Sequence, residues 1–398
     1  MNAFWLERLA RQAEARERKG LTRQRRIIAP VANAEGRLLV RWQGRELVNF
    51  SSNDYLGLAH SPELARAFAG TAQHAASGSA ASPLVTGYQP IHQELEAALC
   101  RFTGQPAACL FSSGYQANLA VGQSLVQRGE RVLADRLNHA SLNDGLRLAG
   151  ARLQRYAHVD LADARQRLGD DTVLLVSDSL FSMDGDLAPL DGLVSICRHR
   201  PTALWIDDAH AFGVLGPGGR GALAATGLPA SSVAIYVATF GKAMGLAGAF
   251  VAGHPQLIEN LENTARGLIY STALPPALAE AALAALALVE SGDTLRARLE
   301  HNIALWQTRC REYALTVPAL DGPIQQLPVG DNDQAVAMAD ALADRGFLVT
   351  AIRPPTVPAG TARLRITLSA AHSAEDILGL VKALSDLREI ITRQPGFH

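Results

Sequence analysis

The sequence lacks an excess of charge of either sign. Lys and Arg total 37 residues and Asp and Glu total 38, which gives a formal net charge of −1 over 398 residues. A protein that binds nucleic acid or an anionic membrane surface usually carries a basic excess, so neither kind of partner is expected. Hydrophobic residues make up 48% of the chain and charged residues 19%, which is typical of a globular protein.

Cysteine is also scarce, and long hydrophobic runs are absent. The four cysteines form no C-x-x-C pair and do not cluster with histidines, so we expect reduced thiols and no metal site. They are Cys100, Cys109, Cys197 and Cys310. Residues 1–20 interleave charged with apolar residues and do not resemble a signal peptide. The most hydrophobic run, Ala273 to Val289, contains Glu280 and favours a buried helix, so we expect a cytoplasmic protein.

Lysine occurs only three times, at positions 19, 242 and 382. Lys19 and Lys382 lie among charged residues and are interpreted as surface groups. Lys242 lies in a small, apolar, glycine-rich segment, Ala238 to Phe250, that holds no other charged residue. One interpretation is a buried amine that contacts a carbonyl or a carboxylate. The other is a Schiff-base lysine, since a desolvated amine can lose its proton and attack an aldehyde carbon.

From residue 51 onward, short apolar runs alternate with helical patterns. This alternation predicts an α/β fold with a mostly parallel sheet that helices cover on both faces. The expected strands are Ala107 to Phe111, Arg131 to Ala134, Thr172 to Ser177, Ala203 to Asp207 and Ser232 to Thr239. We expect an N-terminal helical arm with short strands (1–50), a large α/β domain (51–289) and a small C-terminal α+β domain (290–398).

An acid and two histidines follow the expected strands. Asp207 ends one strand, and His210 comes three residues later. In an open parallel sheet, ligands bind beyond the carboxyl ends of the strands, where a carboxylate could pair with a protonated cofactor ring nitrogen. His139 follows another strand; alone it is typical of a structural histidine, but there it could stack on a cofactor ring. A metal at Asp207 and His210 is disfavoured, because no further ligands have suitable spacing.

A phosphate site is predicted at Phe111 to Asn118, which reads as a strand, a tight turn and the start of a helix. The free N–H groups and the dipole of a helix N-terminus suit a phosphate, although a plain N-cap would use the same residues. Thr239 could add a hydroxyl. The run Gly216 to Gly221 matches G-x-G-x-x-G, but it contains a proline and follows a loop, which disfavours a dinucleotide site.

Together these segments resemble the α-oxoamine synthase family of fold-type I enzymes, which depend on pyridoxal 5′-phosphate (PLP). The match extends from about Arg23 to Asp376. Its marks are SSNDYLGL (Ser51 to Leu58), TGY (Thr86 to Tyr88), FSSGYQAN, FSMDGDLAPL (Phe181 to Leu190), DDAH, TFGK and YSTALPP (Tyr270 to Pro276). The resemblance implies a large domain with a mostly parallel seven-stranded sheet, a smaller C-terminal α+β domain, and a homodimer with shared active sites.

The resemblance also implies roles for individual residues. Lys242 would carry PLP and act as the base at the substrate Cα, Asp207 would pair with the ring nitrogen, and His139 would stack on the ring beside the substrate. The other implied cofactor contacts are Gly114 and Tyr115, which would bind the phosphate largely through backbone groups, Thr239 at the phosphate, Ser182 near the cofactor, His210 at the ring oxygen, and Ser271 and Thr272 from the second subunit. Asp178, four residues before Ser182, is given no catalytic role.

The stretch Arg353 to His372 resembles the family members that join L-alanine to a pimeloyl thioester, with loss of CO2, in biotin biosynthesis. The acyl group would be carried as a thioester by CoA or by an acyl-carrier protein. Arg353 would hold the amino-acid carboxylate, with Thr356 nearby. The acyl substrate would meet an arginine near residue 26. Arg23 and Arg25 compete for that role, and spacing favours Arg26.

Three alternatives remain. The first is a sibling enzyme that joins glycine to acetyl- or succinyl-CoA. The second is an NAD-dependent oxidoreductase, which rests only on the glycine run Gly216 to Gly221. The third is a non-catalytic subunit, which the presence of Lys242, Asp207 and both histidines opposes.

Overall fold

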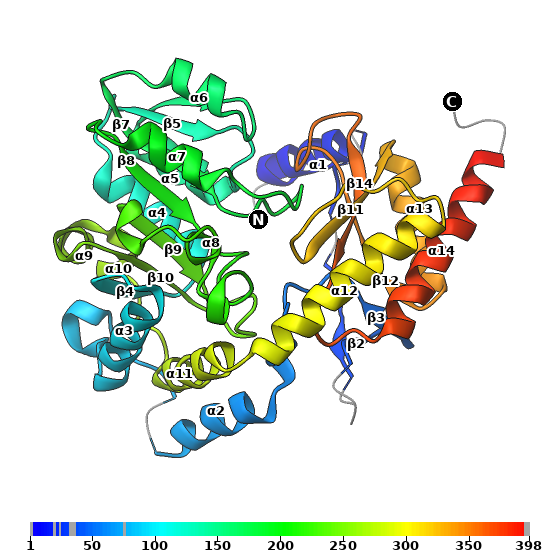
Figure 1. Ribbon diagram of the computed structural model, residues 1–398, viewed down its shortest axis with the longest axis horizontal. Coiled ribbons are helices and arrows are strands. Elements are labelled where there is room, and N and C mark those ends of the chain that lie inside the picture. The colour runs from blue at the N-terminus through cyan, green and yellow to red at the C-terminus, as the bar shows by residue number, and fades with distance from the viewer. Residues whose placement is uncertain (1–2, 19–20, 24, 32–36, 75–76, 394–398) are drawn as a thin grey trace.

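The computed structural model describes residues 3–18, 21–23, 25–31, 37–74 and 77–393. Lys19, interpreted above as a surface lysine, lies outside the described residues. A seven-stranded sheet and its helices occupy the left half of Figure 1, and two smaller sheets lie with the C-terminal helices in the right half. The site described below depends on how these two parts meet.

The large sheet has the strand order β4-β10-β9-β8-β7-β5-β6. Strands β9, β8, β7, β5 and β6 are parallel, whereas β10 is antiparallel to both β4 and β9. The strands are β4 (Ala107–Phe111), β5 (Arg131–Asp135), β6 (Arg152–Tyr156), β7 (Thr172–Asp178), β8 (Ala203–Asp207), β9 (Ile235–Thr239) and β10 (Ala249–Gly253). The predicted α/β fold with a mostly parallel seven-stranded sheet is confirmed.

Helices cover both faces of this sheet, so its central strands are buried on both sides. On one face Cys109, Val132 and Val237 pack in a cluster with α4, α5, α9 and α10. On the other face Leu110 and Leu133 join a larger cluster that includes α3, α7 and α11. The helices of this part are α2 (Pro62–His74), α3 (Pro90–Thr103), α4 (Gly114–Leu125), α5 (Ala140–Ala149), α6 (Leu161–Arg167), α7 (Leu190–Cys197), α8 (Ala222–Ala225), α9 (Pro255–Thr264), α10 (Arg266–Ile269) and α11 (Pro276–Glu290). Burial on both faces explains the non-alternating apolar strands.

Helices α4 and α5 approach closely because each has a glycine where they cross. A Cβ at Gly122 would lie 2.6 Å from the carbonyl carbon of Gly145, and a Cβ at Gly145 would lie 2.6 Å from the carbonyl oxygen of Asn118. A larger residue at either position would push the helices apart. This close packing lets the side chain of Asn118 donate a buried hydrogen bond to Ser141 Oγ at 2.8 Å.

Two smaller sheets complete the fold. In one, β12 from the C-terminal part pairs in parallel with β3, so segments from the N-terminal and C-terminal parts of the chain share a sheet. In the other, β14 lies between β11 and β13 and is antiparallel to both. The elements are α1 (Ala3–Arg18), β1 (Ala29–Pro30), β2 (Leu39–Trp42), β3 (Arg45–Asn49), α12 (Asp293–Glu312), β11 (Ile324–Gly330), α13 (Asn332–Asp344), β12 (Phe347–Leu348), β13 (Thr350–Ile352), β14 (Ala362–Thr367) and α14 (Ala374–Arg393). The domain boundaries at residues 50 and 289 stay predictions.

Sequence patterns miss two strands of the large sheet. Strand β6 lies at the sheet edge and keeps polar, partly exposed side chains, and β10 follows the glycine-rich segment around Lys242. The strand predicted over Ser232 to Thr239 begins only at Ile235, because Ala230–Ser232 forms a 3₁₀ turn. Within the described residues, no helix combines the length and the hydropathy needed to cross a bilayer.

Candidate active site

Four neighbouring parallel strands, β9, β8, β7 and β5, end at one edge of the large sheet. Each is followed within a few residues by a residue that the sequence singled out. These are Lys242 after β9, His210 after β8, Ser182 after β7 and His139 after β5, and β8 itself ends at Asp207. Because the carboxyl ends of parallel strands meet at the same edge, the topology gathers these segments into one site.

Lys242 lies in the turn after β9 and is half-buried. Burial lowers the pKa of its amine to about 8; Asp207 and Asp178 oppose this effect, and Arg365 adds to it. In the part of the chain that the structure describes, no hydrogen bond or ion pair joins Nζ to another residue. A fraction of the amine is therefore uncharged near neutral pH, as attack on an aldehyde carbon requires.

A chain of buried hydrogen bonds connects Asp207 with His139. Asn118 of α4 donates from Nδ2 to Asp207 Oδ2 at 2.6 Å and to Ser141 Oγ at 2.8 Å. Ser141 Oγ in turn lies 2.7 Å from His139 Nδ1. The backbone N–H of Ala209 donates to the other Asp207 oxygen at 3.0 Å. The carboxylate and the imidazole are therefore held in a fixed relation by the crossing of α4 and α5.

His139 is the N-cap residue of α5, and Asp178 anchors it. Its backbone N–H donates to Asp178 Oδ2 at 2.6 Å. Burial, together with the nearby Asp207, raises the pKa of Asp178 well above its ordinary value. The pKa of His139 is lowered by desolvation, which outweighs the opposing charge of Asp207. A neutral imidazole with an exposed ring is suited to stacking on a planar cofactor.

His210 is buried and pairs with Tyr55 from the N-terminal part of the chain. Tyr55 Oη and His210 Nδ1 are hydrogen-bonded at 2.5 Å. Burial lowers the pKa of His210 well below its ordinary value, and the charges of Lys242 and Arg365 lower it further. Burial also raises the pKa of Tyr55 to about 12, so its hydroxyl keeps a proton at neutral pH. Both rings are therefore uncharged.

The predicted phosphate segment lies at the N-terminus of α4. Ser113 is the N-cap residue, and its Oγ accepts from the backbone N–H of Gln116 at 3.2 Å. Gly114 and Tyr115 begin the helix, where first-turn N–H groups have no helical acceptor and favour an anion. A Cβ at Gly114 would lie 3.7 Å from Thr239 Cβ, so this helix end faces the end of β9.

The side chains in this segment already have local partners. Thr239 Oγ1 donates to the carbonyl of Gly248 at 2.7 Å and accepts from the N–H of Gly241 at 3.1 Å. The hydroxyl of Tyr115 donates to Asp144 at 2.6 Å. Backbone N–H groups are therefore the donors that remain for a phosphate, and the backbone role that the resemblance implies for Gly114 and Tyr115 stays a prediction.

Arg365 of β14 is a site residue that the sequence reasoning missed. It is 7% exposed, and its Nε donates to the carbonyl of Ser182 at 2.6 Å. Its charge lowers the pKa of both Lys242 and His210, and no acidic group pairs with it among the described residues. A buried cation without an acidic partner is costly, which makes it a candidate for binding an anion. The signal available in the sequence was a pair of arginines two positions apart, Arg363 and Arg365, in a mostly apolar strand.

The arginines predicted for substrate gather elsewhere, in a groove of about 1210 Å³ between the N-terminal segment and the small sheets. Arg353 donates to the carbonyl of Thr22 at 3.3 Å, and Arg23 donates to Thr356 Oγ1 at 3.0 Å. Arg26 lies 3.6 Å from Asp340, and its guanidinium carbon lies 4.7 Å from the centre of the Trp42 ring. The groove is lined by Arg23, Arg25, Arg26, Arg353 and Thr356 together with Ile27, Ile28 and Trp42.

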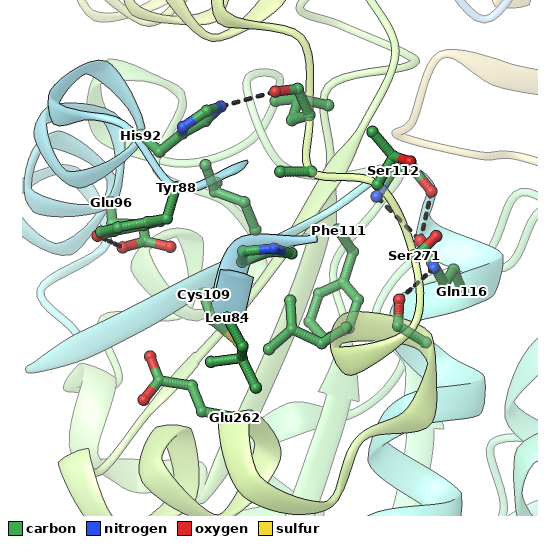
Figure 2. Close-up of a pocket in the computed structure, with 17 residues that line it drawn as sticks. Leu84, Tyr88, His92, Glu96, Cys109, Phe111, Ser112, Gln116, Glu262 and Ser271 are labelled. Carbon is green, nitrogen blue, oxygen red and sulfur yellow. Dashed lines mark hydrogen bonds between the residues drawn. The ribbon is translucent and has the colours of Figure 1, made fainter. Parts of the chain in front are cut away.

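Ser271 and Thr272 line a separate cavity of about 180 Å³ beside the start of α4 (Figure 2). Ser112 and Gln116 form another part of its wall, and Gln116 Nε2 donates to the carbonyl of Gly267 at 2.6 Å. Tyr88 donates to Glu96 at 2.6 Å in the part of the cavity away from Ser271. The role of Ser271 and Thr272 toward a second subunit stays a prediction.

The residues at the strand ends fit PLP by their chemistry. Lys242 provides an amine for the aldehyde, Asp207 a carboxylate for the ring nitrogen, His139 an imidazole face for the ring, and the N-terminus of α4 donors for the phosphate. The donor set suits a metal less well, since no group of three metal-ligating side chains occurs within the described ranges. The glycine run after His210 forms a 3₁₀ turn and is followed by a helix of only four residues, unlike a dinucleotide-binding turn.

Comparisons with known proteins agree with this chemistry. A model of the class I and II aminotransferases matches residues 45–384. The 8-amino-7-oxononanoate synthase of Marinobacter nauticus is 45% identical over 397 residues, which cover 97% of this chain and 99% of that one. The solved 8-amino-7-oxononanoate synthase of Francisella tularensis is 30% identical, with a TM-score of 0.77 over 87% of this chain and 99% of that one. A serine palmitoyltransferase variant from S. paucimobilis, solved with PLP and myriocin bound, is 28% identical, with a TM-score of 0.89 over 96% and 97% of the two chains. The chain is a fold-type I, PLP-dependent acyltransferase that belongs to the 8-amino-7-oxononanoate synthase family.

Proposed function

We propose that the protein condenses L-alanine with a pimeloyl thioester in biotin biosynthesis. The products would be 8-amino-7-oxononanoate, CO2 and the free thiol of CoA or of a carrier protein. The names of the synthase relatives support this reaction, and the motif Arg353 to His372 favours alanine with a pimeloyl group over glycine with a shorter acyl group. The observation that carries the proposal is the half-buried Lys242, with a pKa of about 8, beside the acids Asp207 and Asp178.

Bound PLP supplies an electron-withdrawing ring that stabilises negative charge at the amino-acid Cα. Lys242 then serves as the base that accepts the Cα proton, since desolvation keeps part of its amine uncharged. Asp207 keeps the ring nitrogen protonated, and the Asn118 hydrogen bond holds this carboxylate in place. His139 covers one face of the ring, anchored through its backbone by Asp178.

The amino-acid carboxylate needs a cation close to Lys242. We assign this role to Arg365, because it is buried, lacks an acidic partner among the described residues and acts electrostatically on Lys242. Arg353, the residue predicted from the sequence, lies in the arginine-lined groove beside Thr22. We assign the groove to the acyl donor, since arginines suit its phosphates or terminal carboxylate and Trp42 with the isoleucines suits its carbon chain.

A competition assay tests the reaction. The purified protein is incubated with PLP, equal amounts of L-alanine, glycine and L-serine, and equal amounts of pimeloyl-, acetyl- and succinyl-CoA. Mass spectrometry is expected to find the alanine–pimeloyl aminoketone as the dominant product. A dominant glycine product would mean that Arg353 to His372 does not mark the substrate. If no aminoketone forms with CoA or carrier-protein donors, the chain is a non-catalytic subunit.

Subunit complementation tests the shared active site of a homodimer. Thr272→Glu places a negative charge where the second subunit would meet the phosphate, so this variant is expected to bind PLP poorly. Lys242→Ala is expected to be inactive. Co-expressing the two chains with different tags, and isolating the mixed dimer, is expected to restore about half of the wild-type activity per dimer, because one of the two sites is intact. A mixed dimer as inactive as its parents would contradict the sharing of sites.

A further inference from the structure

Ser182 belongs to the turn after β7, residues 181–186, which we call the Ser182 turn. This turn lies between the large sheet and the small sheets. On the side of the small sheets, Arg363 donates to Asp184 Oδ1 at 2.6 Å, and Gln326 donates to the carbonyl of Asp184 at 3.0 Å. Gly185 presses against β11: its φ is +78°, and a Cβ there would lie 2.3 Å from the carbonyl oxygen of Ile324. The backbone of this turn therefore sits in close contact with the small sheets.

His158 holds the same turn from the side of the large sheet. It is half-buried, with a side chain 12% exposed, and it lies after β6, the strand that pairs with β5. Its Nδ1 is 2.9 Å from Asp135 Oδ1, and its Nε2 is 2.7 Å from Asp186 Oδ2. The ring also packs edge-on against Phe181, with ring centroids 4.4 Å apart. One imidazole thus spans two carboxylates from different segments.

Both carboxylates tie His158 to parts of the active site. Asp135 ends β5, is fully buried and also accepts from the N–H of Leu137, in the loop that leads to His139. Asp186 belongs to the turn of Ser182, and its carbonyl accepts from the N–H of Phe181 at 2.9 Å. Since carboxylates only accept hydrogen bonds, both ring nitrogens of His158 must donate, so the bridge requires the imidazolium form. Burial lowers the pKa of His158, but the hydrogen bonds with Asp135 and Asp186 outweigh it and raise the pKa to about 9.

We propose that His158 is a positioning residue: its bridge between Asp135 and Asp186 fixes the Ser182 turn, and the turn fixes Arg365 for the amino-acid carboxylate. The link from the turn to Arg365 is the 2.6 Å hydrogen bond from Arg365 Nε to the carbonyl of Ser182. Arg365 also donates to Thr367 Oγ1 and to Asn53 Oδ1, each at 3.1 Å, so we expect loss of the bridge to shift the guanidinium rather than to release it. This inference rests on the proposed function, because it assumes an amino-acid substrate whose carboxylate Arg365 binds.

The test compares substrate affinities in PLP-loaded variants. His158→Gln has donors on a single, uncharged nitrogen, so it cannot replace the two separate N–H donors of the imidazolium, and Asp186→Asn removes the charge on one side only. For each variant, the L-alanine dissociation constant is measured from the change in cofactor absorbance, and the KM for pimeloyl-CoA from product formation. We expect His158→Gln to weaken alanine binding by about tenfold and to change the KM for pimeloyl-CoA by less than about twofold. The double variant is expected to bind alanine no more weakly than His158→Gln alone, because both changes break one bridge.

Arg131→Gln is the matched control. Arg131 is a hydrogen-bonded cation at the opposite end of β5, paired with Asp171 and Gln154, so its loss costs stability without touching the site. It is expected to leave alanine binding unchanged. In addition, ¹⁵N NMR of histidines in the cofactor-free protein at pH 7.5 is expected to show His158 protonated on both ring nitrogens.

Three results would overturn the inference. The first is a folded His158→Gln protein with wild-type alanine affinity. The second is an equal loss of affinity for alanine and pimeloyl-CoA, shared by Arg131→Gln, which would indicate general destabilisation. The third is a neutral His158 at pH 7.5. If His158→Gln does not fold, the alanine dissociation constant and the KM for pimeloyl-CoA of Asp186→Asn are compared with those of the wild type instead, and the same outcomes apply. If the wild-type enzyme binds PLP but does not bind L-alanine, the proposed substrate is wrong. The affinities of the variants are then compared for the amino acid that the competition assay identifies.

Discussion

Lys242→Ala is expected to retain less than about one thousandth of the wild-type activity, because proton transfer by a positioned base alone contributes roughly 10²–10⁴-fold. The same variant also loses the amine that would attach the cofactor. Reduction of the wild-type protein with borohydride in the presence of PLP, followed by peptide mass spectrometry, is expected to find the cofactor mass on Lys242. The assay is formation of the aminoketone product under saturating substrates.

Lys382→Ala is the control for this prediction. Lys382 is exposed on α14, and its amine has no role in the site. Activity and borohydride labelling of this variant are expected to match the wild type. A Lys242→Ala protein that turned over at the wild-type rate, or a cofactor label on Lys382, would show that Lys242 is the buried structural amine that its sequence context also allowed.

Arg365→Gln is expected to weaken L-alanine binding by about 100-fold, since a hydrogen bond to a charged group contributes about 1.5–3 kcal/mol. Arg353→Gln is expected to raise the KM for the acyl donor instead, because Arg353 lies in the groove with Arg23 and Thr356. The measurement is the dissociation constant for alanine together with the KM for pimeloyl-CoA in both variants. The different effects of the two variants distinguish the roles of two arginines that lie only 12 positions apart in the sequence.

The reverse pattern would contradict the assignment. If Arg353→Gln weakened alanine binding while Arg365→Gln affected only the acyl donor, the carboxylate site would be at Arg353, as the sequence resemblance implied. Arg365→Lys helps to separate charge from geometry. Lysine keeps the charge but cannot form the planar two-pronged contact, so we expect it to recover only part of the alanine affinity.

The sequence by itself determined the fold class and the segments that carry the chemistry. Strands buried on both faces must be apolar throughout, so β5, β7 and β8 are readable as short runs between helical patterns. Lys242 stood out for a similar local reason. Burying a single charged group in a glycine-rich apolar segment costs free energy, so a lysine there indicates a functional role. These properties depend on a few neighbouring residues, and a linear pattern records them.

Only the tertiary structure decided which distant residues share the site. Arg365 is separated from Lys242 by 123 positions, and no local pattern links its strand in the small sheet to the turn of Ser182. The bridge from His158 to Asp135 and Asp186 likewise joins three segments, and its charged state follows from contacts with both acids. Burial, pairing and pKa depend on what lies across space from a side chain. That information arises only when the sheets and helices pack together.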